Sequence, residues 1–241
     1  MRRLRRERLS EATQSFLQER ARRVLGSAAP NAEVQKLWDA RSNQAFDEIR
    51  STLRSMASGL ARCMYCEDSA GTDIEHFWPK SLYPERAFSW ENYLLACSGC
   101  NSNNKRDQFP LDEVGQPLLI EPTSEDPREH LDLTSRTGKF EARTRKGQKS
   151  IEVFGLSRDA LEKGRRSAWR IISLMLLHYG DACSRSDWRT ALSIQQDLSQ
   201  YPFAGVFVWL IDTAARPDAA MFIDQRCLAV LDKYPDIKHW L

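Results

Sequence analysis

Two Cys-x-x-Cys pairs constrain this chain more than any other feature of its sequence. Cys63 and Cys66 form the first pair, and Cys97 and Cys100 form the second. Four thiolates in two short-span pairs are the ligand set of a closed, tetrahedral zinc site. We therefore predict a structural zinc ion that is held by all four cysteines and has no vacant position for chemistry.

The composition is that of a soluble globular protein. Of its 241 residues, 41% are hydrophobic and 28% are charged. No apolar run approaches the roughly 20 residues that span a bilayer, so no membrane association is expected. The basic start MRRLRRERLSEATQ lacks the apolar stretch of a secretory signal, which favours a cytoplasmic protein. In a reducing compartment the cysteine pairs are expected to be metal ligands, whereas the isolated Cys183 and Cys227 are expected to be buried.

The net charge is only +2, but its distribution is uneven. Residues 1–23 hold eight arginines against three glutamates, a net charge of +5. Residues 136–170 hold eleven arginines and lysines against four acids, a net charge of +7. Such blocks are candidate contacts to the phosphate backbone of DNA, although solvated helix faces carry similar charge.

The pattern of apolar residues and breakers predicts an α+β fold. Residues 3–25 favour a helix, with a disordered basic arm as the alternative, and residues 32–56 favour a second helix. Around the cysteines, extended segments at 72–77 and 88–95 and a short helix after Cys100 predict a ββα unit. Further predictions are a strand at 118–120, a hairpin of 139–144 with 150–154, and helices over 158–178, 186–199, 203–214 and 218–233.

Polar residues lie inside the frame that the cysteines set. Glu75 and His76 follow the first pair, Asn92 precedes the second pair, and Asn101 follows the last cysteine directly. This pattern resembles the HNH endonucleases, whose core is the ββα-metal fold. More narrowly, CMYCE, IEHFWPKS, WENYLLAC and CSGCNSNNKRDQFP resemble the HNH proteins of the Septu anti-phage system and its retron-associated relatives.

The resemblance is clear over roughly residues 60–130, and it implies an organisation in three parts. Residues 1–59 would be a helical, basic segment. Residues 60–130 would be the HNH ββα-metal module with its structural four-cysteine zinc site. Residues 131–241 would combine a basic hairpin with a helical bundle.

The resemblance also implies a role for each polar residue. His76 falls at the position of the general base, and Glu75 falls where the family, usually with Asp, binds the catalytic divalent ion. Asn92 matches the asparagine that orients the base and the loop. Asn101 falls at the third signature position, often His, and would complete the metal ligands. Asn104 is the second candidate for that role, because extra residues before Lys105 leave the register open.

Elementary chemistry supports the same set independently. Phosphodiester hydrolysis needs an activated water and positive charge on the oxygens that become negative. A neutral imidazole suits the base role, and Mg²⁺ or Mn²⁺ prefers oxygen ligands such as Glu75 and an asparagine carbonyl. A buried structural histidine is the alternative for His76. Lys80, Lys105 and Arg106 are expected either to hold phosphates or to be plain surface residues.

The leading interpretation is therefore a metal-dependent HNH endonuclease that cuts DNA in anti-phage defence, beside an ATPase partner. Two alternatives stay open. The chain could be a ribonuclease toxin that acts on tRNA or other RNA, or a non-catalytic zinc adaptor that only binds nucleic acid. Cleavage assays on DNA and RNA separate the three.

Overall fold

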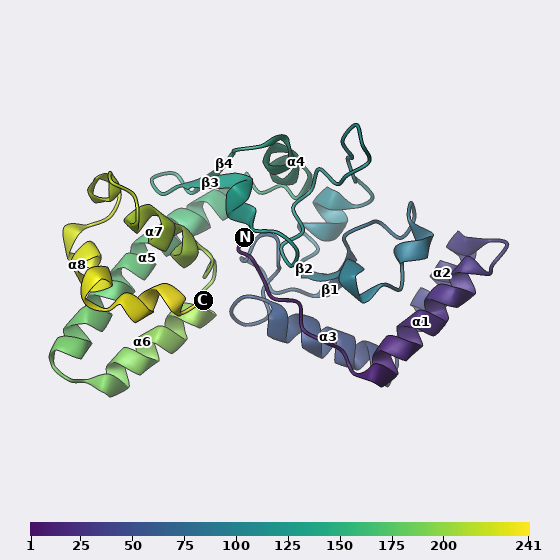
Figure 1. The fold of residues 1–241 in the computed structure, drawn as a ribbon, viewed down its shortest axis with the longest axis horizontal. Helices are drawn as coiled ribbons and strands as arrows, with labels where there is room; N and C mark the ends of the chain where they lie inside the picture. Colours follow the sequence, from purple (N-terminus) through teal and green to yellow (C-terminus); the bar gives the residue numbers. More distant parts are fainter.

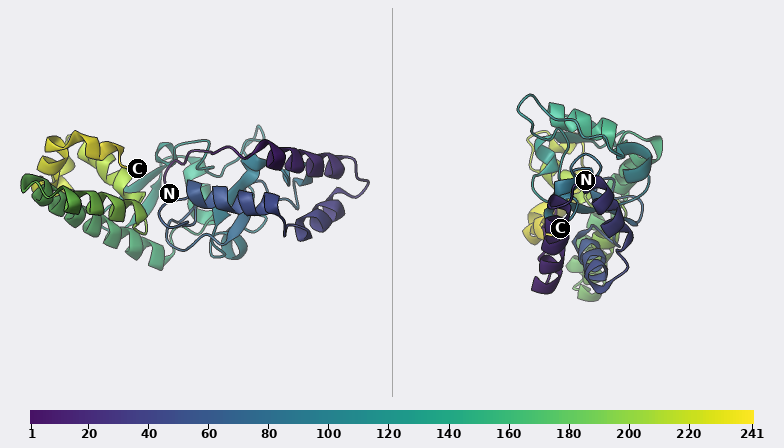
Figure 2. Two further views of the ribbon diagram at one scale, coloured as in Figure 1. Left: turned by 90° about the horizontal axis from the view of Figure 1, so that it is seen from below. Right: turned by 90° about the vertical axis from the view of Figure 1, so that its right-hand side faces the viewer.

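A computed structural model describes all residues, 1–241, and gives an elongated molecule of mixed α+β type. The N-terminal helices lie at one end of its long axis and the C-terminal helices at the other, with the small sheets between them (Figures 1 and 2). The helices are α1 Glu11–Leu25, α2 Pro30–Asp39, α3 Gln44–Met56, α4 Arg145–Val153, α5 Asp159–Ser184, α6 Trp188–Gln200, α7 Val206–Ala214 and α8 Gln225–Lys233. The strands are β1 Asp73–His76, β2 Tyr93–Ala96, β3 Leu131–Thr134 and β4 Lys139–Ala142.

The first helix starts later than the sequence predicts. Residues 1–10 form an extended segment, the N-terminal strap, and α1 begins at Glu11 with Ser10 as its N-cap. The strap is held by contacts that a helix would break. Arg6 donates a hydrogen bond of 2.6 Å to the carbonyl oxygen of Tyr93, and the backbone N–H of Leu4 donates to Pro122 at 2.7 Å. The helix prediction thus holds for residues 11–25, and residues 1–10 form an ordered strap and not a disordered basic arm.

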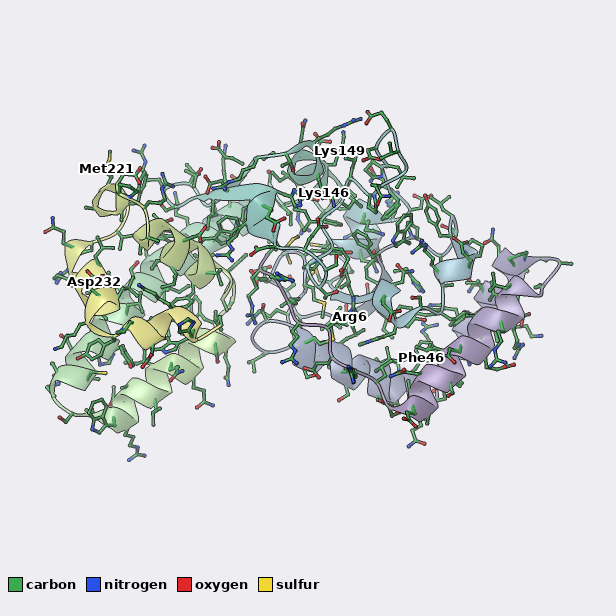
Figure 3. The ribbon with its side chains drawn as sticks, viewed as in Figure 1. Arg6, Phe46, Lys146, Lys149, Met221 and Asp232 are labelled. Atoms are coloured by element: carbon green, nitrogen blue, oxygen red, sulfur yellow. The ribbon has the colours of Figure 1, made fainter.

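The predicted second helix is two helices. It breaks between α2 and α3, where the Asn43 side chain accepts a hydrogen bond from the N–H of Phe46 and caps α3. The freed carbonyl of Ala40 accepts from Arg20 of α1 at 3.0 Å. The break lets α1, α2 and α3 pack around a shared aromatic core, and Phe46 lies in that group of helices (Figure 3).

The predicted ββ pair is confirmed, but its second strand begins later than expected: β2 starts at Tyr93, and residues 90–92 of the expected segment 88–95 form a 3₁₀ turn. Strands β1 and β2 are antiparallel, with His76 opposite Tyr93 and Asp73 opposite Ala96. The segment after Cys100 is helical, but it is a π-helix, Asn101–Lys105, with Lys105 N–H bonded to Cys100 O at 3.0 Å. A π-helix holds more residues per turn than an α-helix, and such turns often mark functional sites.

The predicted hairpin of 139–144 with 150–154 is wrong. Residues 139–142 do form a strand, β4, but it pairs with β3 through a turn that contains Gly138 at φ +75°. Residues 145–153 form α4, because the Thr144 side chain caps the helix by accepting from the N–H of Gly147. Leu118–Ile120 is buried but forms no strand.

The C-terminal helices follow the prediction closely. The helix that begins near residue 158 is α5, which continues beyond the expected end, to Ser184. Helices α6 and α7 overlap the predicted ranges 186–199 and 203–214, whereas α8 begins only at Gln225 instead of residue 218, after a short 3₁₀ turn, Ala219–Met221. Met221 and Asp232 lie at this end of the molecule (Figure 3). The main apolar core extends from the N-terminal strap to Ile237, and a small separate cluster holds Ala182, Cys183 and Ala191. None of the helices has the length and apolarity that crossing a membrane requires.

Candidate active site and metal centre

The four paired cysteines come together in space. Their Sγ atoms all lie within 4.8 Å of one another, and all four side chains are buried. The turns that carry them flank the β1–β2 pair, one before β1 and one after β2. Zn–S bonds of about 2.3 Å in a tetrahedron place sulfurs about 3.8 Å apart, close to the 3.9 Å between the Sγ atoms of Cys66 and Cys97. The cluster can therefore hold a metal ion such as zinc.

One cation from the C-terminal part supports this cluster. Arg158, just before α5, donates a hydrogen bond of 3.1 Å to the sulfur of Cys100. Four thiolates around one Zn²⁺ leave two negative charges, which a nearby guanidinium partly offsets. A Cβ atom on Gly99 would lie 2.6 Å from Arg158, so glycine keeps that approach open. The sequence contained no signal for Arg158.

His76 ends β1 and is buried, with its orientation fixed by a backbone acceptor. Its Nε2 lies 3.0 Å from the carbonyl oxygen of Ala87. Because a carbonyl only accepts, Nε2 carries the proton and Nδ1 is the basic atom. Trp38 of α2 packs against the ring at 4.4 Å between centroids. Burial lowers the pKa of His76 to about 3, so the imidazole is neutral at physiological pH.

Glu75 is buried beside a single cation. The Nζ atom of Lys105 lies 2.6 Å from Oε1 of Glu75, and the Lys105 side chain has no exposed surface. The two groups form a buried, charge-assisted ion pair through Oε1 of Glu75. Lys105 also donates to the carbonyl oxygen of His76 at 2.9 Å. Neither role expected of Lys105, phosphate contact or plain surface, fits a fully buried ammonium group.

Asn92 holds the loop that connects β1 to β2. Its side-chain oxygen accepts from the N–H of Trp78 at 2.7 Å. Its amide group donates to the carbonyls of Trp78 and Arg86, both at 3.0 Å. All these partners belong to the loop that also carries Ala87, the acceptor for His76. The side chain therefore makes loop contacts and lies outside the cleft described below.

The structure separates the two candidate asparagines. Asn101 lies in the same cleft as Glu75 and His76, whereas Asn104 donates to the carbonyl of Gly99 and packs against Gly155. Asn101 donates from Nδ2 to Oδ2 of Asp73 at 3.2 Å, which leaves its Oδ1 as the free acceptor. Asp73 was missed by the sequence reasoning. Its position two residues before Glu75 on a strand places it on the same face, a signal that was available.

The shared cavity, here called the His76 cleft, has a volume of about 260 Å³. Its walls come from β1, the following loop, the π-helix turn and Trp38 of α2. A larger hollow, about 860 Å³, lies elsewhere, between the strap with α1 and residues 88–91, and it contains none of the predicted site residues. A neutral imidazole, a buried carboxylate and an amide oxygen in one cleft suit proton abstraction beside a hard cation.

The two basic blocks are partly structural. Arg6 and Arg20 bind backbone carbonyls, and buried Arg165 does so too, at Gly138 and Leu156. Several others pair with carboxylates, as Arg145 does with Glu113. The arginines of residues 1–23 that remain exposed are Arg3, Arg5, Arg8, Arg22 and Arg23. Charge counted along the sequence therefore overstates the free basic surface.

Comparison with known proteins gives three matches, and no known family profile matches the chain. The chain is 31% identical over 169 residues to the Septu protein PtuB of Bacillus mycoides (strain KBAB4), covering 57% of this chain and 56% of that protein. It is 29% identical over 114 residues to the Septu protein PtuB of Bacillus thuringiensis, covering 45% and 41%. It is 30% identical over 88 residues to protein ea31 of Escherichia phage lambda, covering 36% and 30%. The chain thus spans about half the length, or less, of the relatives that it matches, and its similarity to Septu proteins covers about half of its own residues.

Proposed function

We propose that this chain is a metal-dependent HNH endonuclease that hydrolyses phosphodiester bonds of DNA. The observation that carries the proposal is the His76 cleft, where His76, Glu75 and Asn101 meet beside the four-cysteine cluster. A protein that only binds nucleic acid has no need for a buried base and a buried carboxylate in one cleft. The adaptor alternative is therefore the weaker one.

The residues of the cleft have different roles in hydrolysis. His76, held by its Nε2 contact to Ala87, takes a proton at Nδ1 from the water that attacks phosphorus. Glu75 and Oδ1 of Asn101 both line the cleft and offer oxygen ligands. A bound Mg²⁺ or Mn²⁺ would supply positive charge to the phosphate oxygens and the leaving group. A zinc ion in the four-cysteine cluster would fix the turns that flank β1 and β2.

Similarity to Septu proteins supports an anti-phage defence role, with this chain as the nuclease effector. The resemblance to the Septu and retron-associated HNH proteins implies an ATPase partner. Activity of the isolated chain would then depend on that partner. The test must accordingly include an ATPase encoded beside this chain in its genome, which the neighbouring reading frame would identify.

The proposal is tested by plasmid cleavage with Mg²⁺ or Mn²⁺, with and without the ATPase. Wild type should nick or linearise supercoiled DNA, and His76→Ala should lose about a hundredfold or more in rate. His178→Ala is the matched control, because His178 is exposed on α5. Equal products from wild type and His76→Ala, both folded and zinc-loaded, would refute the role of His76. Cleavage of total RNA but not of DNA would establish the ribonuclease alternative instead.

A further inference from the structure

Two cations face the His76 cleft without a carboxylate partner. They are Lys80, on the loop after β1, and Arg106, directly after the π-helix. Lys105, by contrast, is committed to Glu75. Asp107 also lines the cleft, yet its carboxylate forms no ion pair with Arg106. The cleft therefore has positive charge that the fold itself does not neutralise.

Arg106 has a backbone conformation that favours glycine. Its φ is +51° and its ψ is −118°. The N–H of Gln108 donates to the carbonyl of Lys105 at 2.8 Å, so Arg106 is the first central residue of a type II′ turn. Glycine is the preferred residue there because a Cβ atom strains the turn. A large cationic side chain at such a position is a candidate for a functional constraint.

The π-helix ties this turn to the cleft. The N–H of Arg106 donates to the carbonyl of Asn101 at 2.8 Å, which is the last bond of the π-helix. The same asparagine holds its side chain in the cleft. The position of Arg106 is thus set relative to a candidate ligand of the divalent ion.

The guanidinium group of Arg106 is available for a ligand. Its Nε donates to the carbonyl of Ser102 at 3.2 Å, and this contact fixes the plane of the group. Its two terminal nitrogens have no partner within the protein, and the side chain is exposed. Two parallel N–H donors match two oxygens of one phosphate group.

We propose that Arg106 binds a backbone phosphate of the nucleic acid at the His76 cleft. This inference rests on the proposed function, because it assumes that the cleft receives a phosphodiester. The strained turn after the π-helix would then serve to hold the Arg106 side chain against the substrate. Lys105 is buried in the ion pair with Glu75 and takes no part in that contact.

Binding tests the inference without any need for cleavage. A fluorescein-labelled DNA duplex is titrated in Ca²⁺ with His76→Ala and with His76→Ala carrying Arg106→Ala. Loss of one charged, bidentate contact should weaken binding about 10- to 100-fold and reduce the slope of log K against log salt by about 0.9. Arg106→Lys should keep the slope and lose part of the affinity. Equal affinity and slope for Arg106→Ala and its parent would overturn the inference.

Replacement of Arg106 by glycine removes the side chain and the backbone strain together, so it distinguishes a role in DNA binding from a role in folding. Arg106→Gly should unfold no more readily than wild type, yet bind and cut DNA about tenfold more weakly. Ser186→Gly is the matched control, because Ser186 also has a positive φ, +57°, and is exposed after α5. That variant should bind and cut as wild type does.

The outcomes distinguish this inference from the proposed function. If wild type cuts DNA and Arg106→Gly cuts and binds equally well, the inference fails and the proposed function stands. If wild type cuts neither DNA nor RNA even with the ATPase partner present, but Arg106→Ala weakens DNA binding as stated, the proposed function fails and the phosphate contact stands.

Discussion

The ammonium group of Lys105 lies 2.6 Å from the Glu75 carboxylate, and both side chains are almost fully shielded from water. Removing one member of a buried pair leaves an uncompensated charge, so Lys105→Met should lower the free energy of unfolding by about 3–5 kcal/mol. The double variant Glu75→Gln, Lys105→Met should recover most of that loss. Urea denaturation of zinc-saturated protein at pH 7.5 measures both.

The pH dependence of the stability of Lys105→Met provides a second check. Burial raises the pKa of Glu75 above its ordinary value of 4.5, and the charge of Lys105 opposes the shift. Because the pKa of Glu75 is raised in the folded state, its contribution to the free energy of unfolding is fully present below its ordinary pKa. That contribution is lost as the pH rises through the pKa of the folded state. The defect of Lys105→Met relative to wild type should therefore shrink towards pH 4.5. A defect that is constant with pH would show that Lys105 acts through packing alone.

The sequence predicted the cysteine cluster and the strand that carries His76, because thiol spacing and a short segment that favours extended structure are local signals. It could not predict that Lys105 is buried, since lysine is almost always exposed. The extra residues before Lys105 left the choice between Asn101 and Asn104 open, because only the folded backbone places Asn101 in the cleft and turns Asn104 away from it. The strap was missed because the carbonyl of Tyr93, which binds Arg6, is 87 residues away in the chain.

His76 should give the protein a distinct pH dependence. Burial lowers its pKa from 6.5 to about 3. Below its ordinary pKa the histidine of the unfolded chain binds a proton, whereas the buried histidine of the folded protein does not. The free energy of unfolding therefore falls as the pH drops from 6.5 towards the pKa of the folded state. Between pH 7 and pH 5 wild type should therefore lose about 2 kcal/mol more than His76→Gln, both zinc-saturated. Identical losses would mean that water reaches the ring.

The low pKa of His76 also predicts how the cleavage rate changes below pH 7. A base with an ordinary pKa loses about tenfold in rate for each pH unit below about 6.5. A base with a pKa near 3 stays neutral, so the cleavage rate attributable to His76 should change by less than about threefold between roughly pH 7 and pH 5.5. Single-turnover cleavage at saturating Mg²⁺ measures this, with zinc content checked at each pH. A steep fall over that range at constant zinc would contradict the burial of the ring.

Asp73 should act on the divalent ion through Asn101. It accepts the amide N–H of Asn101 at 3.2 Å and so leaves Oδ1 as the free oxygen. Loss of such an orienting contact typically weakens metal affinity about 10- to 100-fold. Asp73→Ala should therefore raise the Mn²⁺ concentration needed for half-maximal cleavage by about tenfold, and Asp73→Asn should raise it less. Asp197→Ala, exposed on α6, is the control and should have no effect.

Removal of zinc should unfold the module rather than only inhibit it. Metal binding at such sites can contribute on the order of 10 kcal/mol to folding. Cys100→Ser should abolish stoichiometric zinc and the far-ultraviolet circular dichroism of the native fold, as a strong chelator should in wild type. Cys183→Ser is the matched control, because Cys183 of α5 is buried in a small separate cluster between α5 and α6. Native dichroism in zinc-free Cys100→Ser would contradict the structural role.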